Sequence, residues 1–306
     1  MSAKSLFNRS LLCTGLLCLG TLAANAALLV YDPFNYSPVG ADLTNQSPDG
    51  GATLWNVTGT NGVSGTDPIT IAGGSLSIAG LAPSIGNSIT YGGLGLTNRI
   101  SLGSIFTSGT LYYSFALQVT DLSNLSTTGG FLAGFNTSIG DQAAQPSQVG
   151  ARVVTRASGT GGFQVGVDKS SGGAMSFVMD PTIFNLGDTI FVVGSYTFIS
   201  GGTTNDEARM WVNPDPSTFG LENAPPTSLF STAINDVNLS GAIQIQSFLF
   251  RQGNATAVPN ALIADELRVG TTWADVTPAI PEPSAVMLLS LVGSAGLFLR
   301  RRGLRG

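Results

Sequence analysis

The stretch Gly109–Thr120, with the sequence GTLYYSFALQVT, alternates between two kinds of side chain along its length. Every odd position from Leu111 to Val119 is large and apolar, whereas the even positions include Ser114 and Gln118. Successive side chains of a β-strand point to opposite faces of the sheet. The pattern therefore predicts an antiparallel strand with one face in a core and the other partly open to solvent.

A second stretch, Asp188–Ile199 (DTIFVVGSYTFI), is apolar on both faces between Ile190 and Val193. This is typical of a central strand, and we expect a second sheet to cover it. Within Ala242–Phe250 the apolar parity shifts between Ile245 and Phe248, which predicts a β-bulge or a correction at a sheet edge. Further strands are predicted at Ala151–Arg156, Gly161–Lys169, Met175–Met179, Glu207–Asn213, Ala242–Phe250 and Ala261–Gly270.

Clusters of Gly and Ser separate these segments, and the body shows neither a helical stripe nor a fixed-period repeat. The chain has 306 residues, of which 43% are hydrophobic, so it can bury one large core. We predict an all-β fold, a two-sheet antiparallel β-sandwich with jelly-roll connections, formed by one domain at residues 27–279.

Charge and residue usage exclude several classes of function. Residues 27–280 contain seven basic and 17 acidic residues, a net charge of −10, which disfavours nucleic acid as a partner. Histidine is absent, and the two cysteines, Cys13 and Cys18, lie in the first twenty residues. Zinc fingers, His-based triads, cysteine nucleophiles and a disulfide framework are therefore not expected, and no cofactor or metal is predicted.

The N-terminal residues 1–26 have the layout of a secretory signal peptide. Lys4 and Arg9 precede the apolar run Leu11–Leu22, and the small residues Ala24 and Ala26 form an A-x-A cleavage site. We expect export by the Sec route and cleavage after Ala26. A retained anchor is the alternative, for which an apolar run of about 12 residues is short.

The C-terminal residues 280–306 have three parts in a fixed order. Pro281, Glu282 and Pro283 come first, and an apolar segment at about 284–299 follows them. Its 15 uncharged residues from position 285 would span about 22 Å as a helix, against a hydrocarbon core of about 30 Å, so the span is marginal. A basic tail at 300–306 completes it, with Arg300, Arg301, Arg302 and Arg305. These arginines should hold this end in the cytoplasm and stop translocation.

This order of parts resembles the PEP-CTERM sorting signal of certain Gram-negative bacteria. The resemblance implies a processing enzyme as partner, the membrane-embedded exosortase, which removes the tail. It also implies a transient inner-membrane anchor and a final place at the cell surface or in the exopolysaccharide matrix. The same tail has been labelled an ice-binding protein C-terminal domain. An ordinary single-span anchor is the alternative, since it needs only the apolar run and the arginines.

Two stretches of the body carry a second resemblance. Residues 28–43 (LLVYDPFNYSPVGADL) and 261–278 (ALIADELRVGTTWADVTP) look like the first and last strands of concanavalin A-like, laminin-G-type sandwiches found in front of PEP-CTERM tails. The resemblance implies that these two terminal strands lie close together.

Some concanavalin-like sandwiches are β-glucanases with an E-x-D-x-x-E strand, which places two carboxylates on one sugar. The glutamates of the body are Glu207, Glu222 and Glu266, and none has an aspartate two positions later. We therefore predict that the protein is not an enzyme, with a glycoside hydrolase built from carboxylates on separate strands as the alternative. A third hypothesis, an ice-binding protein, lacks regular threonine arrays in the body.

The acidic doublets Asp206-Glu207 and Asp265-Glu266 could suggest calcium, but neither lies in an Asp-x-Asp-x-Asp loop, so we interpret both as structural. Asp206-Glu207 is expected to be a turn acid with a solvated neighbour. Strand parity groups Asp265 with Ile263, Leu267 and Val269. We therefore expect the Asp265 side chain to point inward and to form hydrogen bonds with neighbouring backbone groups.

A sugar platform requires an exposed aromatic ring with polar neighbours. Trp211 with Arg209 and Asn213 is our candidate, and the alternative for it is a role in the core. Trp55, Trp273 and Tyr112 are further candidates, and for each of them a place in the core or covering the sheet is the alternative. The sequence thus predicts a non-enzymatic surface or matrix protein, with weak carbohydrate binding as an option for its body.

Overall fold

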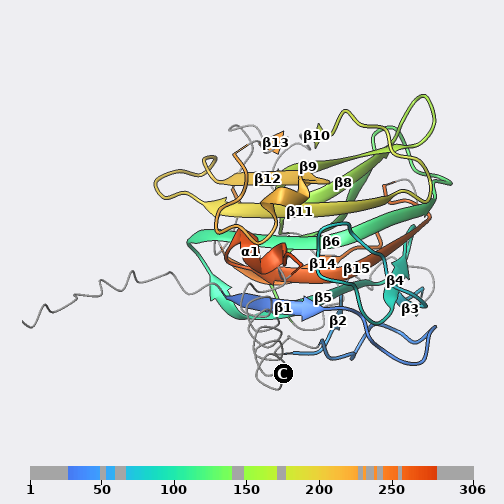
Figure 1. Cartoon of the computed structure of the whole chain (residues 1–306). Coiled ribbons are helices and arrows are strands. Elements are labelled where there is room, and N and C mark those ends of the chain that lie inside the picture. Colours follow the sequence, from blue (N-terminus) through green and yellow to red (C-terminus); the bar gives the residue numbers. More distant parts are fainter. Residues whose placement is uncertain are drawn as a thin grey trace, which may run out of the picture.

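The structure is a computed structural model that describes residues 27–48, 53–58, 67–139, 148–170, 177–226, 230–231, 238–239, 244–253 and 257–280. Two antiparallel β-sheets lie face to face across these residues, and one hydrophobic core fills the space between them (Figure 1). The predicted all-β sandwich is therefore confirmed.

The first sheet contains eight of the described strands. Its long central members are β6 (Gly109–Asp121), β11 (Thr189–Phe198) and β15 (Ala261–Gly270). The order is β13-β12-β11-β6-β15-β4-β3, and β1 pairs with β15. The remaining strands are β1 (Leu28–Asp32), β3 (Thr70–Ala72), β4 (Ser88–Tyr91), β12 (Glu207–Val212) and β13 (Phe230–Ser231).

The second sheet contains seven of the described strands in the order β10-β9-β8-β7-β14-β5-β2. The chain crosses repeatedly between the two sheets, since β6 of the first sheet precedes β7 of the second and β14 of the second precedes β15 of the first. The strands are β2 (Asn56–Thr58), β5 (Thr97–Phe106), β7 (Gly130–Asn136), β8 (Val149–Ala157), β9 (Phe163–Ser170), β10 (Val178–Met179) and β14 (Ile245–Phe250).

Both stretches that predicted the fold form central strands. The odd positions of β6 from Leu111 to Val119 are at most 1% exposed and lie in the core. In β14 the register shifts between Ile245 and Ser247, which confirms the predicted bulge. The strand expected at Met175–Met179 is described only as the short β10, at its last two residues.

Aromatic side chains form the centre of the core. Tyr113 contacts Phe135 with ring centroids 5.1 Å apart and Phe248 at 5.0 Å, which joins the two sheets. The buried Tyr113 hydroxyl donates to the Ala151 carbonyl oxygen at 2.6 Å. Opposite this ring lies Gly194 of β11, where an added Cβ would come within 2.2 Å of the tyrosine. The glycine therefore makes room for the ring.

The outer face of β11 differs from the expectation of a second covering sheet. Ile190 and Val192 do face the other sheet, but Phe191 and Val193 face outward. There they pack in a separate cluster with Trp211, Phe219, Trp273 and Val276. A short helix and a loop thus cover this side of the first sheet, because the strand is apolar on both faces but only one sheet lies against it.

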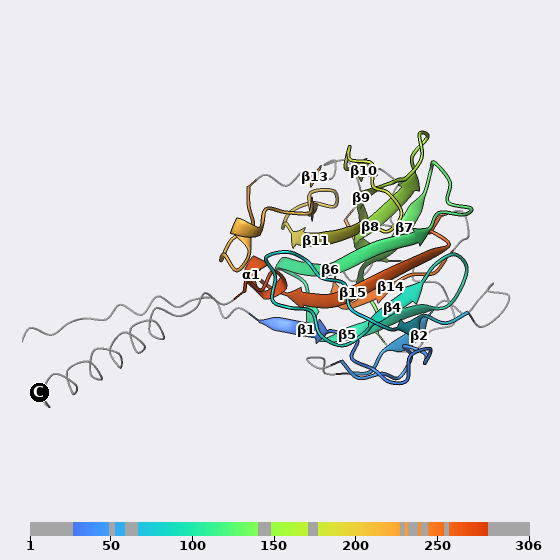
Figure 2. The ribbon, with the colours of Figure 1, turned by 45° about the vertical axis from the view of Figure 1, so that its right-hand side comes forward.

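The two ends of the described chain are adjacent. β1 pairs with β15, with Leu28 opposite Gly270, which confirms the expected closeness of the terminal strands. The N–H of Thr271 donates to the carbonyl oxygen of Ala27 at 3.3 Å. Both ends lie on the same side of the sandwich (Figure 2).

The Asp265 side chain points away from the core, opposite to the predicted inward direction. A register shift between Asp265 and Arg268, with Glu266 at φ 54°, inserts a bulge into β15. Leu267 therefore lies in the core together with Ala264, whereas Asp265 lies on the outer face of the sheet. A bulge of this kind changes which face later side chains take.

Candidate functional site

The segment just before the C-terminal tail is held by the short helix α1 (Trp273–Val276). Thr272 caps the helix, and its side chain and that of Asp275 satisfy each other's backbone N–H groups in a capping box. The buried Trp273 indole donates from Nε1 to the carbonyl oxygen of Thr218 at 2.8 Å. The ring also meets Trp211 edge-on at 5.1 Å. The helix is therefore fixed to both the sheet and the loop beside it.

Residues 277–280, which we call the terminal clasp, run between two loops. The N–H of Gly220 donates to the carbonyl oxygen of Thr277 at 2.7 Å on one side. On the other side the N–H of Ala82 donates to the carbonyl oxygen of Pro278 at 2.9 Å, and Leu81 forms a β-bridge with Ala279. The backbone is thus hydrogen-bonded on both sides up to two residues before Pro281.

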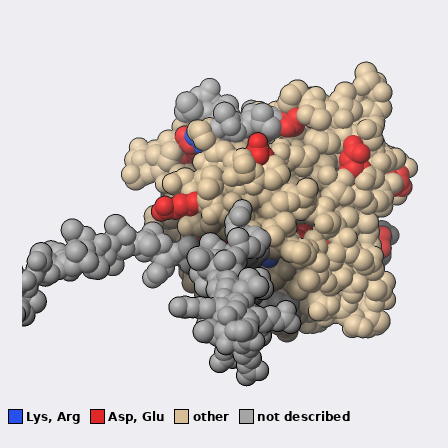
Figure 3. Space-filling model, viewed as in Figure 1, with Lys and Arg blue, Asp and Glu red and all other residues tan. Residues whose placement is uncertain are grey.

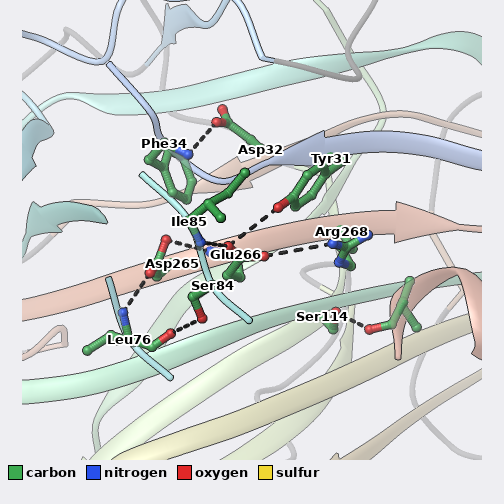
Figure 4. A network of polar contacts seen from close by, with 11 residues as sticks. Tyr31, Asp32, Phe34, Leu76, Ser84, Ile85, Ser114, Asp265, Glu266 and Arg268 are labelled. Carbon is green, nitrogen blue, oxygen red and sulfur yellow. Dashed lines mark hydrogen bonds and ion pairs between the residues drawn. The ribbon is translucent and has the colours of Figure 1, made fainter. Parts of the chain in front are cut away.

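The covering loop, residues 73–86, supplies one side of this clasp and is itself fastened to β15. Asp265 accepts a hydrogen bond from the N–H of Leu76 at 2.7 Å, and Glu266 accepts one from the N–H of Ile85 at 3.1 Å. Ser84 donates to the Leu76 carbonyl oxygen, which closes the loop on itself. Figure 4 shows the two carboxylates side by side beneath the loop.

Burial shapes the charges of this network. Burial raises the pKa of Asp265 to about 8, an effect that the hydrogen bonds from Leu76 and Glu266 partly oppose. Burial also raises the pKa of Glu266 and lowers that of Arg268, whose guanidinium lies 3.8 Å from the Glu266 carboxylate. Tyr31, stacked 3.9 Å from Arg268, has its pKa raised to about 12 by burial and the charge of Glu266.

The cavity beside this network, lined by Ser114, Phe191, Glu266 and Arg268 among others, has a volume of about 10 Å³. This is space for about one water molecule. The buried carboxylates therefore hold the covering loop and do not open onto a space that could accommodate a sugar.

The other acidic doublet is also engaged in structure. Asp206 is buried and accepts hydrogen bonds from the Tyr196 hydroxyl at 2.8 Å and the N–H of Ile199 at 2.7 Å. Glu207 pairs with Arg209 at 2.6 Å at the surface. Within the described ranges no group of three or more acidic, cysteine or histidine side chains is placed to bind a metal.

Trp211, the candidate sugar platform, is 4% exposed. Its Nε1 donates to the carbonyl oxygen of Pro225 at 3.2 Å, and one ring edge lines a hollow of about 250 Å³ together with Asn213. Asn213 also accepts from the N–H of Phe191 through its side chain, whereas Arg209 is bound to Glu207. The three residues are close in sequence but have separate structural partners, and little of the indole face is open.

The remaining aromatic candidates are placed in the core or against it. Trp55 is fully buried and donates from Nε1 to Asp32 at 2.7 Å. Tyr112 is partly buried and packs against Trp211 with ring centroids 6.4 Å apart.

The sorting and signal residues lie outside the described residues: Ala24 and Ala26, Pro281, Glu282 and Pro283, and Arg300, Arg301, Arg302 and Arg305. Among the helices of the described part of the chain, none is long and apolar enough to cross a membrane. The apolar segment at 284–299 falls in the residues that the structure does not describe.

The sequence did not single out a group of arginines on the outer face of the second sheet. Arg99, Arg152, Arg156 and Arg251 come from three separate stretches of sequence, and their strands β5 and β8 and the end of β14 bring them to one face. The alternation of side chains along a strand could have predicted the face on which each arginine lies. It could not have predicted which strands are adjacent in the sheet. The opposite side of the molecule, formed by the first sheet and its loops, is mostly uncharged with scattered acidic side chains (Figure 3).

Comparison with known proteins gives one family match. Residues 279–302 match the PEP-CTERM protein-sorting motif. No curated protein matches the chain.

Among solved structures, the alginate lyase Aly36B is 12% identical, with a TM-score of 0.46 over 78% of this chain and 95% of that one. An endo-β-1,4-glucuronan lyase from the fungus Trichoderma reesei is also 12% identical, with a TM-score of 0.39 over 74% and 98%. The globular domain of T. cruzi calreticulin is 9% identical, with a TM-score of 0.43 over 80% and 88%. At these identities the likeness concerns the fold. The chain carries a PEP-CTERM protein-sorting motif behind a body whose structural neighbours are concanavalin-like lyases and lectin domains.

Proposed function

We propose that this protein is an exported, non-enzymatic component of the cell surface or exopolysaccharide matrix, sorted through its C-terminal tail by an exosortase. The observation that carries the proposal is the sorting motif at 279–302, which begins inside the terminal clasp. The clasp supports it because the described contacts of the body reach Ala279, the first residue of the sorting motif.

The three parts of the tail act in series. The apolar segment at 284–299 holds the exported chain in the inner membrane, and the arginines from Arg300 onward stop translocation. Pro281 and Pro283 favour an extended backbone, because proline fixes its own φ and restrains the residue before it. The strip between the body and the membrane therefore stays open to a processing enzyme.

The state of the glutamates supports a non-enzymatic body. Glu207 is paired with Arg209, and Glu266 is bound to Ile85 and Arg268 beneath the covering loop. A glycoside hydrolase uses two carboxyl groups that face one sugar. The role we assign to the body is to bind carbohydrate of the matrix without cleaving it.

The sorting proposal is tested by replacing Pro281, Glu282 and Pro283 with alanine in a host with a matching exosortase. Alanine allows the apolar helix to extend back through the strip, so we expect the chain to stay anchored and unprocessed. Cell fractionation and intact-mass measurement follow processing, and an alanine replacement of Ser284 alone serves as the matched control. Release of the triple variant at the wild-type rate would leave only an ordinary anchor.

The role of the body is tested with the full chain purified in a nonionic detergent. Incubation with a panel of polysaccharides should give retention of polymer without new reducing ends. Released reducing ends would reverse the non-enzymatic assignment and favour a hydrolase or a lyase. Inhibition of ice recrystallisation would favour the ice-binding alternative.

A further inference from the structure

The outer face of the second sheet concentrates positive charge in an acidic protein. Residues 27–280 contain seven basic residues against 17 acidic ones, and four of the seven lie on this one face. They are Arg99 of β5, Arg152 and Arg156 of β8, and Arg251 directly after β14. Their strand neighbours Ile100, Val153 and Phe250 point into the core, which places the arginines on the outer side.

Phe131 of β7 lies between two of these arginines. The guanidinium carbon of Arg251 is 4.2 Å from the centre of the ring, and that of Arg152 is 5.0 Å away. Phe131 is half-buried, so part of its side chain is reachable from solvent. The guanidinium of Arg251 thus lies over the face of the ring in a cation–π contact, which orients its N–H donors.

The arginines of this face have different partners. Arg152 forms an ion pair with Asp168. Arg251 donates to the carbonyl oxygen of Phe131 at 3.3 Å, and it has no carboxylate partner among the described contacts. Burial and the nearby charge of Arg152 together lower the pKa of Arg251 to about 10. A second like charge is costly here unless an anion neutralises it.

Arg156 extends the same row toward the edge of the sheet. Its Nε and Nη2 donate to the side-chain oxygen of Gln164 at 3.0 and 2.9 Å, a neutral partner. Gln164 in turn donates to the Asp180 carbonyl oxygen at 2.8 Å, which fixes the orientation of its amide. Arg156, Gln164, Phe131 and Arg251 are all half-buried, so a ligand can reach them from outside.

We propose that this face, from Gln164 and Arg156 across Phe131 to Arg251, binds a carboxylate-bearing polysaccharide. A carboxylate of the polymer is held by Arg251, whose fork of N–H donors matches a carboxylate and whose guanidinium is positioned by its contact with Phe131. The sheet repeats its strands about 4.8 Å apart, so that Arg156 is placed for a further acidic group along the polymer. This site rests on the proposed carbohydrate binding by the body and adds the class of ligand.

The test uses the full chain in a nonionic detergent with three polymers: a polyuronate, a sulfated dextran and a neutral glucan. Binding is followed by affinity electrophoresis and calorimetry. We expect the polyuronate to bind most tightly, with an affinity that falls as salt rises. Arg251→Gln and Arg156→Gln should each weaken it by about tenfold or more, because each removes a charge-assisted hydrogen bond. Arg209→Gln, on the other sheet, is the matched control and should bind like the wild type.

Arg251→Lys separates a folding defect from loss of recognition, since it keeps the charge but loses the fork of donors. Its melting temperature should stay near that of the wild type, and its affinity should fall between those of the wild type and Arg251→Gln. Equal binding of the polyuronate by the wild type and both glutamine variants would overturn the arginine site and leave carbohydrate binding in place. Equal binding of the sulfated and carboxylated polymers would overturn the carboxylate assignment. If no polymer binds at all, the proposed binding role of the body fails with it.

Discussion

Replacing Asp265 with asparagine should change how the stability of the body depends on pH. The Asp265 side chain is fully buried and its pKa is raised from 3.8 to about 8. Below about pH 4 the carboxyl is protonated in both the folded and the unfolded state, and its full contribution to stability is present. As the pH rises toward 8 the unfolded state ionises first, so this contribution is lost progressively.

The magnitude follows from the same shift. Each pH unit in this window lowers the free energy of unfolding by about 1.4 kcal/mol, so that about 3 kcal/mol is lost between pH 5 and pH 7. Asparagine does not titrate. In the wild type the two carboxyl oxygens of Asp265 accept hydrogen bonds from the N–H groups of Leu76 and Glu266, and the amide nitrogen of asparagine cannot accept one of these two bonds. That loss costs about 1–2 kcal/mol at every pH.

The variant should therefore be less stable than the wild type at pH 5 and equal or more stable at pH 7. Urea unfolding of residues 27–280 at a series of pH values gives the difference, in which the other titrating groups cancel. The exposed Glu222→Gln is the matched control, and its difference from the wild type should stay constant. A difference between Asp265→Asn and the wild type that does not change with pH would refute the reasoning.

Three further substitutions test the packing around the site. Trp273→Ala removes a fully buried indole and should lower the free energy of unfolding by about 3–5 kcal/mol, measured by urea titration. Gly194→Ala places a Cβ within 2.2 Å of Tyr113 and should cost about 1–3 kcal/mol or more, and unchanged stability in the same titration would show that the ring can move. Gly220→Val introduces a side chain at φ 72° close to Ala279 and should loosen the terminal clasp, seen as faster proteolysis after position 276; wild-type cleavage rates would contradict this.

The sequence predicted the sandwich because its central strands carry complete periodic patterns. Gly109–Asp121 keeps the alternation over its whole length, and the bulge in β14 is visible as a break in parity after Ile245. The strand β5 was missed because Arg99 and Ser101 alternate with apolar residues on a face that is itself covered, so both kinds of position are buried. β7 was missed because its glycines interrupt the alternation.

The candidate sites were less predictable because they depend on which strands become neighbours. The bulge at Glu266 places Asp265 and Leu267 on opposite faces of the sheet, although they are two residues apart. No feature of the residues 261–270 signals this bulge. The burial of Trp211 depends on Trp273, which is 62 residues away in sequence and meets it only through α1. The arginine face could not be predicted for the same reason, since β14 lies between β7 and β5 in the sheet although it follows both by more than 100 residues.

The position of the terminal clasp sets a limit on how far the body can stand from a membrane. Among the described residues, Ala279 is the last with identified backbone contacts to the body, and the uncharged run begins at position 285. A chain of about six residues reaches at most about 20 Å when fully extended. For a protein anchored by its tail, as we propose, the helix α1 and the loop at Gly220 therefore face the lipid headgroups at close range.

Because β1 pairs with β15, the N-terminal end of the body is also close to the point where the tail begins. Ala27 is hydrogen-bonded to Thr271, only eight residues before Ala279, so the point where the proposed signal peptide leaves the body adjoins the point where the tail begins. The body can fold while either end is still inserted in the bilayer, and cleavage at one end does not require it to turn over. If an enzyme cuts near Pro281 while the tail is anchored, as we propose, it has to act within about 20 Å of the membrane surface.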